Sequence, residues 1–229
     1  MNLKEQAARR ALAYLESGMV LGLGTGSTTA YFLELLGEQL RAGTLHDIVG
    51  VPTSEQTAER ARSRGIPLAT LADHERLDLV IDGADEVDGD LNMIKGLGRA
   101  LLREKIVESQ ADRFVVIVDE SKVVQRLGRG PLPVDLVPFG YQVQLHWLNA
   151  LGCRTEMRRE SDGSLAITDD GNYMVLCRFP EGIADPHTLA RTLADRPGIA
   201  EHGLFLDMAT DVIVAGTAGI RVMSREEQI

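Results

Sequence analysis

The residue types that could do chemistry gather in four short polar segments, each of which follows an apolar run. These segments are GTGST from Gly24, PTSEQT from Pro52, DGADE from Asp82 and DESK from Asp119. Short apolar runs predict buried strands, and ligands of an open parallel sheet bind beyond the carboxyl ends of its strands. We therefore expect hydroxyl groups, two acids three residues apart and one lysine, Lys122, to face a single crevice.

The glycine-rich stretch GLGTGSTTAYF, residues 22–32, has the composition of a nucleotide-binding loop but not its spacing. It lacks the third glycine of the dinucleotide fingerprint, and it has no lysine for the distal phosphates of a nucleoside triphosphate. What remains is three hydroxyls, on Thr25, Ser27 and Thr28, at the expected N-terminus of a helix, where N–H groups and the helix dipole favour an anion. The stretch indicates a site for one small phosphate; the alternative is a glycine turn with an ordinary Ser/Thr cap.

The acidic stretch DGADEVDG, residues 82–89, contains Asp82 and Asp85. A solvated turn and a metal site are the alternatives to a catalytic role. A divalent metal would need more acids or carbonyls from the other strand ends, which offer mainly hydroxyls and a lysine. Proton transfer by paired carboxylates is favoured, because one can stay charged while the pKa of the other is raised.

The stretch NMIKGLGRALLREKIVES, residues 92–109, predicts a helix in which Leu101, Glu104 and Val107 share one face. Glu104 would then interrupt an apolar stripe. A desolvated carboxylate whose pKa is lifted toward neutrality suits a general base for carbon acids, whereas the alternative is a surface glutamate paired with a neighbouring cation. Lys95, just before a pair of glycines, could hold its ammonium against a developing oxyanion or could be a solvated lysine.

Composition limits the class of protein. The 229 residues are 44% hydrophobic and 25% charged, as in ordinary globular proteins, and the net charge of −10 argues against nucleic acid as a partner. No signal peptide and no membrane-length apolar run is evident, so a cytoplasmic protein with no membrane partner is expected. Cys153 and Cys177 lack C-x-x-C spacing and are expected to be buried free thiols, and the five histidines lack metal-ligand spacing.

The first half of the chain alternates strand and helix patterns, which predicts an α/β fold: a Rossmann-like parallel sheet flanked by helices. The expected strands are 19–23, 47–51, 77–81 and 114–118, and the expected helices are 27–40, 54–64 and 98–109. The stretch GRGPLPVDLVPFG interrupts this pattern and indicates a domain boundary or a crossing between domains.

A smaller α+β domain is expected after that stretch, inserted before the last strands. Its expected elements are a helix at 141–151, strands at 153–159, 165–169 and 173–179, and a helix at 185–195. The apolar runs 203–207 and 211–216 are expected to return to the large sheet. The predicted domains are therefore 1–130 plus 203–229, which would be catalytic, and 131–202.

Six segments together resemble the type A ribose-5-phosphate isomerases, in the order found in that family: GLGTGSTTAYF, PTSEQT, DGADEVD, KGLGRALLREKIV, DESK and PLPVDLVPFG. The resemblance covers most of the chain. It implies an aldose–ketose isomerase of the non-oxidative pentose phosphate pathway that uses neither a metal nor another cofactor. Its substrates would be the sugar phosphates D-ribose 5-phosphate and D-ribulose 5-phosphate, and the family's habit implies a homodimer or homotetramer.

By the same resemblance, Glu104 is the base that moves a proton between two carbons through an enediolate. Asp82, with Asp85 nearby, would handle ring opening and proton traffic among the oxygens, and Lys95 would stabilise the enediolate charge. The remaining substrate-binding residues would be Lys4, Thr25, Gly26, Ser27, Thr28, Gly83, Ala84, Gly96, Leu97, Gly98 and Lys122.

One departure from the family pattern is the stretch KGLGRA, which has Leu97 and Arg99 where glycine or alanine is commoner. These side chains could narrow the loop or re-aim its backbone donors, and Arg99 could add a phosphate contact. Three other classes of protein remain open: a sugar-phosphate-binding sensor, an amino-sugar-phosphate isomerase or deaminase, and an enzyme similar to CoA-transferases, in which Glu104 would form a covalent adduct.

Overall fold

The computed structural model describes residues 2–225, which form two compact units. Unit 1 contains residues 2–84, 103–122 and 207–225, and unit 2 contains residues 85–102 and 123–206. The expected domains, 1–130 plus 203–229 and 131–202, remain a prediction about separately folding parts. The compact units differ from the expected domains for two main reasons. The short strands in residues 85–102 pair within unit 2, and Leu127 belongs to the hydrophobic core of that unit.

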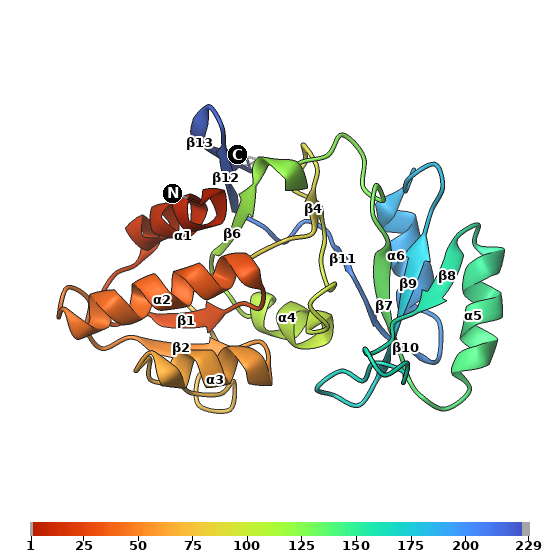
Figure 1. Cartoon of the computed structure of the whole chain (residues 1–229), viewed down its shortest axis with the longest axis horizontal. Helices are drawn as coiled ribbons and strands as arrows, with labels where there is room; N and C mark the ends of the chain where they lie inside the picture. The colour runs from red at the N-terminus through yellow and green to blue at the C-terminus, as the bar shows by residue number, and fades with distance from the viewer. Residues whose placement is uncertain (1, 226–229) are drawn as a thin grey trace. The chain divides into compact units, whose positions relative to one another are not determined.

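Unit 1 is built on a six-stranded sheet in the order β13-β12-β6-β3-β1-β2 (Figure 1). The strands are β1 (Val20–Leu23), β2 (Val49–Pro52), β3 (Leu79–Asp82), β6 (Phe114–Asp119), β12 (Asp211–Gly216) and β13 (Gly219–Ser224). All neighbours pair in parallel except β12 and β13, which form an antiparallel hairpin. The predicted α/β fold with a parallel sheet is confirmed, and DVIVAG returns to this sheet as expected.

Helices pack on both faces of this sheet. They are α1 (Leu3–Ala11), α2 (Ser27–Arg41), α3 (Glu55–Ser63) and α4 (Leu101–Glu108), with short 3₁₀ turns η1 (Leu12–Tyr14) and η2 (Glu120–Lys122). One core joins the buried side of α1 and α2 to alternate strand residues such as Leu21 and Ile81. On the opposite face, Gly22 lets α4 approach, because a Cβ there would lie 2.9 Å from Val107 Cγ1.

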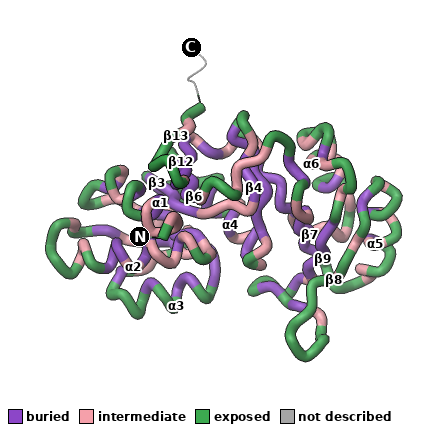
Figure 2. The backbone as a smooth tube through the Cα atoms, turned by 45° about the horizontal axis from the view of Figure 1, so that its top comes forward, coloured by how far each residue is buried: buried purple, intermediate pink, exposed green. Residues whose placement is uncertain are grey.

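Unit 2 contains a four-stranded antiparallel sheet in the order β10-β7-β9-β8 and a small sheet in the order β11-β5-β4. The strands are β4 (Glu86–Val87), β5 (Met93–Ile94), β7 (Leu132–Leu136), β8 (Arg154–Met157), β9 (Tyr173–Arg178), β10 (Ile199–His202) and β11 (Leu204–Phe205). Two helices, α5 (Tyr141–Ala150) and α6 (Pro186–Ala194), complete the unit. Figure 2 shows β7 and β9 largely buried, whereas α5 and α6 have exposed sides.

The small domain differs from the expected elements in three places, and two expectations are wrong: the strand at 165–169 and the return of 203–207 to the large sheet. The proline-rich stretch forms a buried inner strand, β7, because Pro133 gives up only one donor and still accepts a hydrogen bond from the N–H of Gly203 (2.8 Å). Residues 165–169 form isolated bridges rather than a strand. The run at 203–207 pairs with β5 as β11 instead of joining the large sheet. Cys153 and Cys177 are buried free thiols, as predicted.

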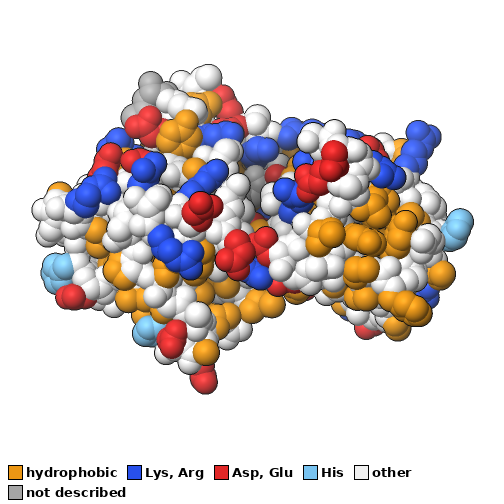
Figure 3. Space-filling view, turned by 60° about the horizontal axis from the view of Figure 1, so that its bottom comes forward, with side chains coloured by type: hydrophobic (Ala, Val, Ile, Leu, Met, Phe, Trp, Pro, Cys, Tyr) orange, Lys and Arg blue, Asp and Glu red, His pale blue; other side chains and the backbone are white. Residues whose placement is uncertain are grey.

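Side chains of both charges are interspersed on the face drawn in Figure 3, and hydrophobic side chains gather over part of it. In unit 2 the exposed large hydrophobic residues are Val137, Phe139, Val143 and Ile167. Phe139 is 92% exposed. Among residues 2–225, no helix has both the length and the apolar character needed to span a bilayer.

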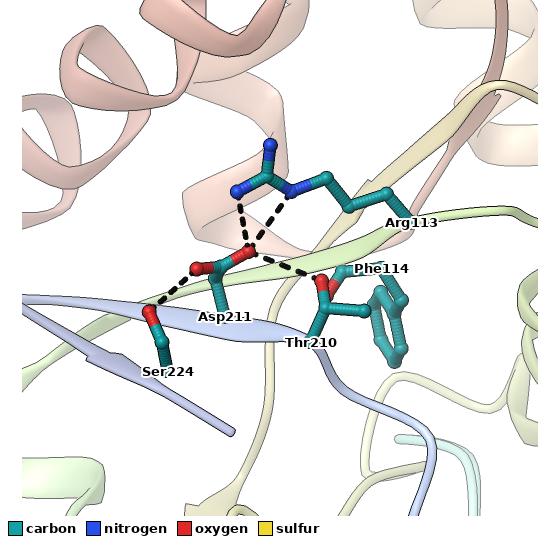
Figure 4. Close-up of polar contacts among 5 residues, drawn as sticks. All are labelled: Arg113, Phe114, Thr210, Asp211 and Ser224. Atoms are coloured by element: carbon teal, nitrogen blue, oxygen red, sulfur yellow. Dashed lines mark hydrogen bonds and ion pairs between the residues drawn. The ribbon is translucent and has the colours of Figure 1, made fainter. Parts of the chain in front are cut away.

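A polar network fixes the end of the unit 1 sheet at which β6 and β12 begin (Figure 4). Asp211 Oδ2 accepts hydrogen bonds from Arg113 Nε (2.9 Å) and Nη2 (2.8 Å), and its Oδ1 accepts one from Ser224 Oγ (2.7 Å). Thr210 Oγ1 donates to the carbonyl of Phe114 at 2.8 Å. Because strands β6 and β12 run away from it, this network lies at the opposite end from the strand-end loops and is structural.

Candidate active site

The four polar segments singled out in the sequence follow four strands that are neighbours in the unit 1 sheet. The strands β6, β3, β1 and β2 lie side by side and run parallel, so their carboxyl ends share one edge. The segment GTGST follows β1, and the segments PTSEQT, DGADE and DESK begin with the last residues of β2, β3 and β6. The predicted gathering of these loops at one edge is confirmed within unit 1, which includes the acidic stretch only as far as Ala84.

Hydroxyl groups tie the first two loops together. Thr25 Oγ1 lies 2.8 Å from Thr53 Oγ1, 2.8 Å from Ser54 Oγ and 3.0 Å from Thr57 Oγ1. Thr57 Oγ1 donates to the carbonyl of Gly24 at 2.9 Å. Thr25 is therefore engaged in a hydroxyl cluster, and the supporting roles of Thr53 and Thr57 are visible only in the fold.

The turn into α2 has the features expected of an anion site. Gly26 has φ +138°, a conformation that favours glycine, and α2 starts at the next residue. Ser27 is exposed, Thr28 is half-buried, and the Lys4 ammonium donates to Ser27 Oγ at 2.8 Å. A lysine from α1, the N-terminus of α2 and two hydroxyls therefore converge, an arrangement that suits a phosphate.

Asp82 is fully buried and firmly oriented. Its Oδ1 accepts hydrogen bonds from Thr25 N (3.0 Å), Thr29 Oγ1 (3.2 Å) and Gly83 N (2.6 Å). A Cβ on Gly24 would lie 2.0 Å from Asp82 Cγ, so the loop can pass this carboxylate only with glycine at that position. Gly83 and Ala84 follow, both half-buried. The solvated-turn alternative for Asp82 is wrong.

The helix α4 buries the face that the sequence predicts. Leu101, Glu104 and Val107 are 0%, 3% and 4% exposed, so the alternative of a surface glutamate at position 104 is wrong. Its neighbour Arg103 forms an ion pair with Glu55, with Nη1 and Oε1 2.8 Å apart. Glu108, one turn after Glu104, is also 3% exposed, and the sequence analysis did not single it out.

Lys122 lies in η2, directly after β6, and is half-buried. Its ammonium makes no hydrogen bond or ion pair with the part of the chain that the structure describes. The preceding turn is fixed by Asp119, whose Oδ1 accepts a hydrogen bond from Ser121 N at 3.0 Å. Lys122 therefore offers a positive charge on a shaped turn at the edge of the unit 1 sheet.

The other predicted site residues belong to unit 2. Lys95 follows β5, is 2% exposed, and has its Nζ 5.3 Å from the ring centroid of Phe205, so the solvated-lysine alternative is wrong. The Lys95 N–H donates to the carbonyl of Gly203 at 2.9 Å. Asp85 Oδ2 accepts the N–H of Leu97 at 3.0 Å, which links the acidic loop to the KGLGRA loop.

The KGLGRA loop is shaped by its glycines and by an ion pair. Gly96 has φ +113°, and a Cβ there would lie 2.6 Å from Leu101 Cδ2, so this position needs glycine. Leu97 is half-buried and Gly98 is exposed. Arg99 forms an ion pair with Glu160, so its guanidinium is engaged within unit 2.

Metal ligands do not gather at these positions. Across the described residues, no group of three or more His, Cys, Asp or Glu side chains is arranged to hold a metal ion. Both carboxylates of the acidic loop instead accept hydrogen bonds, Asp82 Oδ1 from backbone and hydroxyl donors and Asp85 Oδ2 from the Leu97 amide.

Comparison with known proteins identifies the family. Residues 49–219 match the family model for ribose 5-phosphate isomerase A (phosphoriboisomerase A). A ribose-5-phosphate isomerase A from Roseiflexus castenholzii is 52% identical over 218 residues, which cover 95% of this chain and 93% of the relative.

Solved structures agree with the sequence relatives. A D-ribose-5-phosphate isomerase in complex with phospho-erythronic acid is 43% identical, with a TM-score of 0.95 over 98% of this chain and 100% of that one. The ribose 5-phosphate isomerase of Plasmodium falciparum is 38% identical, with a TM-score of 0.95 over 98% of each chain. This chain belongs to the ribose 5-phosphate isomerase A family.

Proposed function

We propose that this chain interconverts D-ribose 5-phosphate and D-ribulose 5-phosphate through an enediolate, as an aldose–ketose isomerase of the non-oxidative pentose phosphate pathway. Family membership supports the reaction, and the relative bound to phospho-erythronic acid supports a sugar phosphate as the ligand. The proton moves between neighbouring carbons, so the reaction needs a base, a charge stabiliser and a grip on the phosphate.

The turn into α2 binds the phosphate in this proposal. Backbone N–H groups of Gly26, Ser27 and Thr28 begin the helix, and the Lys4 ammonium already donates to Ser27 Oγ at 2.8 Å. Lys122 adds a second positive charge. Thr25 shapes the turn through its hydroxyl cluster, so that its amide and the following donors keep one orientation.

Glu104 acts as the general base that carries the proton between the two carbons. Its place in the family stretch KGLGRALLREKIV, together with its burial at 3% exposure on the apolar face of α4, carries the catalytic assignment. A carboxylate removed from water is a stronger base, because its charged form loses hydration. The fixed position of α4 on the sheet, made possible by Gly22, holds the base in one place.

The other catalytic and binding roles are assigned to residues of the acidic loop and of the KGLGRA loop. Asp82, held by three donors, moves protons among the sugar oxygens during ring opening, with Asp85 as its companion. Lys95 stabilises the charge of the enediolate. The substrate contacts proposed for Gly83, Ala84, Gly96, Leu97 and Gly98 are made by their backbone.

Replacing Glu104 by Gln tests this proposal. The amide keeps the shape but cannot accept the proton, so turnover should fall by a factor on the order of a thousand or more, with little change in the affinity for a substrate analogue. The parent should exchange the migrating hydrogen with deuterium from the solvent, and the variant should show almost no exchange. D-ribose 5-phosphate should also be turned over in preference to amino-sugar phosphates.

Glu108→Gln is the matched control, because Glu108 is a second 3%-exposed glutamate one turn further along α4. It should keep turnover within about tenfold of the parent. A folded Glu104→Gln protein that turns over substrate near the parent rate would refute the assignment, and Asp82 or Asp85 would become the next candidate base.

Location and assembly also remain proposals. A cytoplasmic location follows from the sequence analysis alone. A homodimer or homotetramer follows from the family resemblance, and the exposed hydrophobic residues of unit 2, with Phe139 92% exposed, are consistent with a surface that another copy covers.

A further inference from the structure

Unit 2 contains a pocket that the proposed isomerase chemistry does not use. Its volume is about 480 Å³, within the range of small-molecule sites. The walls come from the loop at 126–130 and from the chain at 178–182, which begins at the end of β9. None of the residues proposed above for the isomerase lines this pocket.

The pocket is basic, although the chain as a whole carries a net charge of −10. Three arginines line it, Arg126, Arg129 and Arg178, against one acid, Glu181. Guanidinium groups are the side chains best suited to bind phosphate and carboxylate through paired N–H donors. Such a concentration of positive charge in an acidic protein points to an anion.

A pair of like charges beside the pocket supports the same conclusion. Arg178 on β9 lies directly opposite Arg154 on β8, two antiparallel neighbours that Figure 1 shows side by side. Like charges in this arrangement destabilise a sheet. Within residues 2–225, neither guanidinium has a hydrogen bond or an ion pair. A bound anion would relieve this repulsion.

The walls of the pocket are fixed in advance. Gly128 and Gly182 have φ of +92° and +74°, and the N–H of Ile183 donates to the carbonyl of Leu127 at 2.8 Å. A Cβ on Gly182 would lie 3.1 Å from that same carbonyl oxygen. Glycine at these positions therefore lets the two wall segments pack closely, and the pocket needs little ordering when a ligand binds.

Glu86 determines which groups face the pocket. This carboxylate is 3% exposed and accepts the N–H groups of Gly128 (2.8 Å), Arg129 (3.3 Å) and Gly130. The backbone donors of the loop are therefore engaged behind the wall. Among the side chains of the wall, Arg178 has no hydrogen bond or ion pair within residues 2–225, and Arg126 Nη1 donates to the carbonyl of Glu181 at 3.5 Å. Phe179 and Pro180 supply an apolar surface beside these arginines.

We propose that this pocket binds a small molecule carrying a phosphate or pyrophosphate group, with the anion at Arg126, Arg129 and Arg178 and the rest of the molecule against Phe179. The site is separate in sequence and in unit from the phosphate-binding turn proposed at α2.

The proposal is tested by titrating ¹⁵N-labelled protein with inorganic pyrophosphate and following the backbone amides of Gly128, Gly130 and Gly182. We expect saturable shifts at these three amides, which report on this pocket independently of Gly24 and Gly26 in the α2 turn. Arg178→Gln should weaken this binding by at least about tenfold, since each guanidinium makes charge-assisted bonds, and should leave the isomerase turnover unchanged.

Arg158→Gln is the matched control, because Arg158 is an exposed arginine of unit 2 outside the pocket. It should bind pyrophosphate like the parent. A thermal unfolding scan of Arg178→Gln without ligand should show unchanged or increased stability, because a like charge is removed. The proposal fails if the three amides do not shift, or if Arg158→Gln weakens binding as much as Arg178→Gln.

Discussion

Burial alone does not separate a catalytic carboxylate of this protein from a structural one. Glu86 and Glu104 are both 3% exposed, but Glu86 accepts three backbone N–H groups of one loop and therefore serves as that loop's anchor. Asp82 is also fully hydrogen-bonded at one oxygen, yet its partners belong to the turn proposed to hold substrate. The partners of a buried acid therefore indicate its role.

Ser27→Ala tests the phosphate turn at the scale of one hydroxyl. Ser27 is exposed, so its loss should leave folding stability within about 0.5 kcal/mol of the parent. The substrate phosphate is present in both the ground state and the transition state, so KM should rise about tenfold while kcat changes little. Steady-state kinetics and competitive inhibition by inorganic phosphate measure this, with Ser63→Ala on α3 as the control. Phosphate inhibiting the Ser27 variant as strongly as the parent would contradict the assignment.

The loop from Lys95 to Arg99 shows how one element can accept a residue foreign to its family pattern. Leu97 contributes its N–H to Asp85 at 3.0 Å, and this bond does not depend on the side chain. The glycine that the loop cannot replace is Gly96, with φ +113° and Leu101 beside it. The backbone positions of the loop are therefore set by Gly96 and Asp85.

Leu97→Gly should accordingly be tolerated. The half-buried Leu97 side chain belongs to neither of the two described core clusters. We therefore expect the free energy of unfolding to fall by no more than about 1 kcal/mol, because glycine makes the unfolded chain more flexible. The kcat/KM of the variant should equal or exceed that of the parent. Thermal unfolding and steady-state kinetics measure both quantities. Leu101→Ala provides the contrast, because truncating this fully buried leucine should lower the free energy of unfolding by about 2–5 kcal/mol. A comparable loss for Leu97→Gly would show that Leu97 is a core residue.

At the scale of the whole molecule, a buried acid in unit 2 links stability to pH. Asp135 on β7 is 1% exposed, and its Oδ1 has no hydrogen-bond partner among the described residues. Burial, with the charges of Asp170 and Glu201, raises the pKa of Asp135 to about 7. Between about pH 4 and pH 7 the unfolded chain loses this proton while the folded protein keeps it, so the parent loses stability as pH rises.

Asp135→Asn removes this dependence. Its free energy of unfolding, relative to the parent, should increase as pH rises from about 4 to 7, by up to about 4 kcal/mol, and should then level off. Urea unfolding at a series of pH values measures the difference. Asp162→Asn is the control, because hydrogen bonds from Ser164 lower the pKa of the exposed Asp162, so that this group stays charged in both states above about pH 4 and the variant should show no change between about pH 4 and 7. A difference that does not change with pH would contradict the expected titration.

The reaction should also proceed without a metal. The strand-end loops supply hydroxyls and lysines, and the proposed proton relay uses only side chains of this protein. We expect unchanged turnover of D-ribose 5-phosphate after exhaustive dialysis against a strong chelator. Loss of activity that a divalent metal restores would overturn this mechanism.

Much of unit 1 could be predicted from the sequence, because its signals are local. Apolar runs followed by polar segments marked the strands β1, β2, β3 and β6 and the loops at their carboxyl ends. The three-residue spacing of Leu101, Glu104 and Val107 predicts the buried face of α4, because residues three or four positions apart lie on the same face of a helix. The GTGST loop of unit 1 and the KGLGRA loop of unit 2 are recognisable from their glycines.

The tertiary structure decided what depends on partners distant in sequence. Pro133 suggested a break in the pattern, yet the pairing of β7 with β9 and β10 makes that stretch an inner strand. Thr57 donates a hydrogen bond to the Gly24 carbonyl, and Arg154 lies opposite Arg178 in the sheet; in each case the two residues are more than 20 positions apart in the sequence. Residue propensity and spacing indicate whether a segment forms a helix or a strand. Its strand partners, its burial and the electrostatic field at its side chains are set by the elements that pack against it.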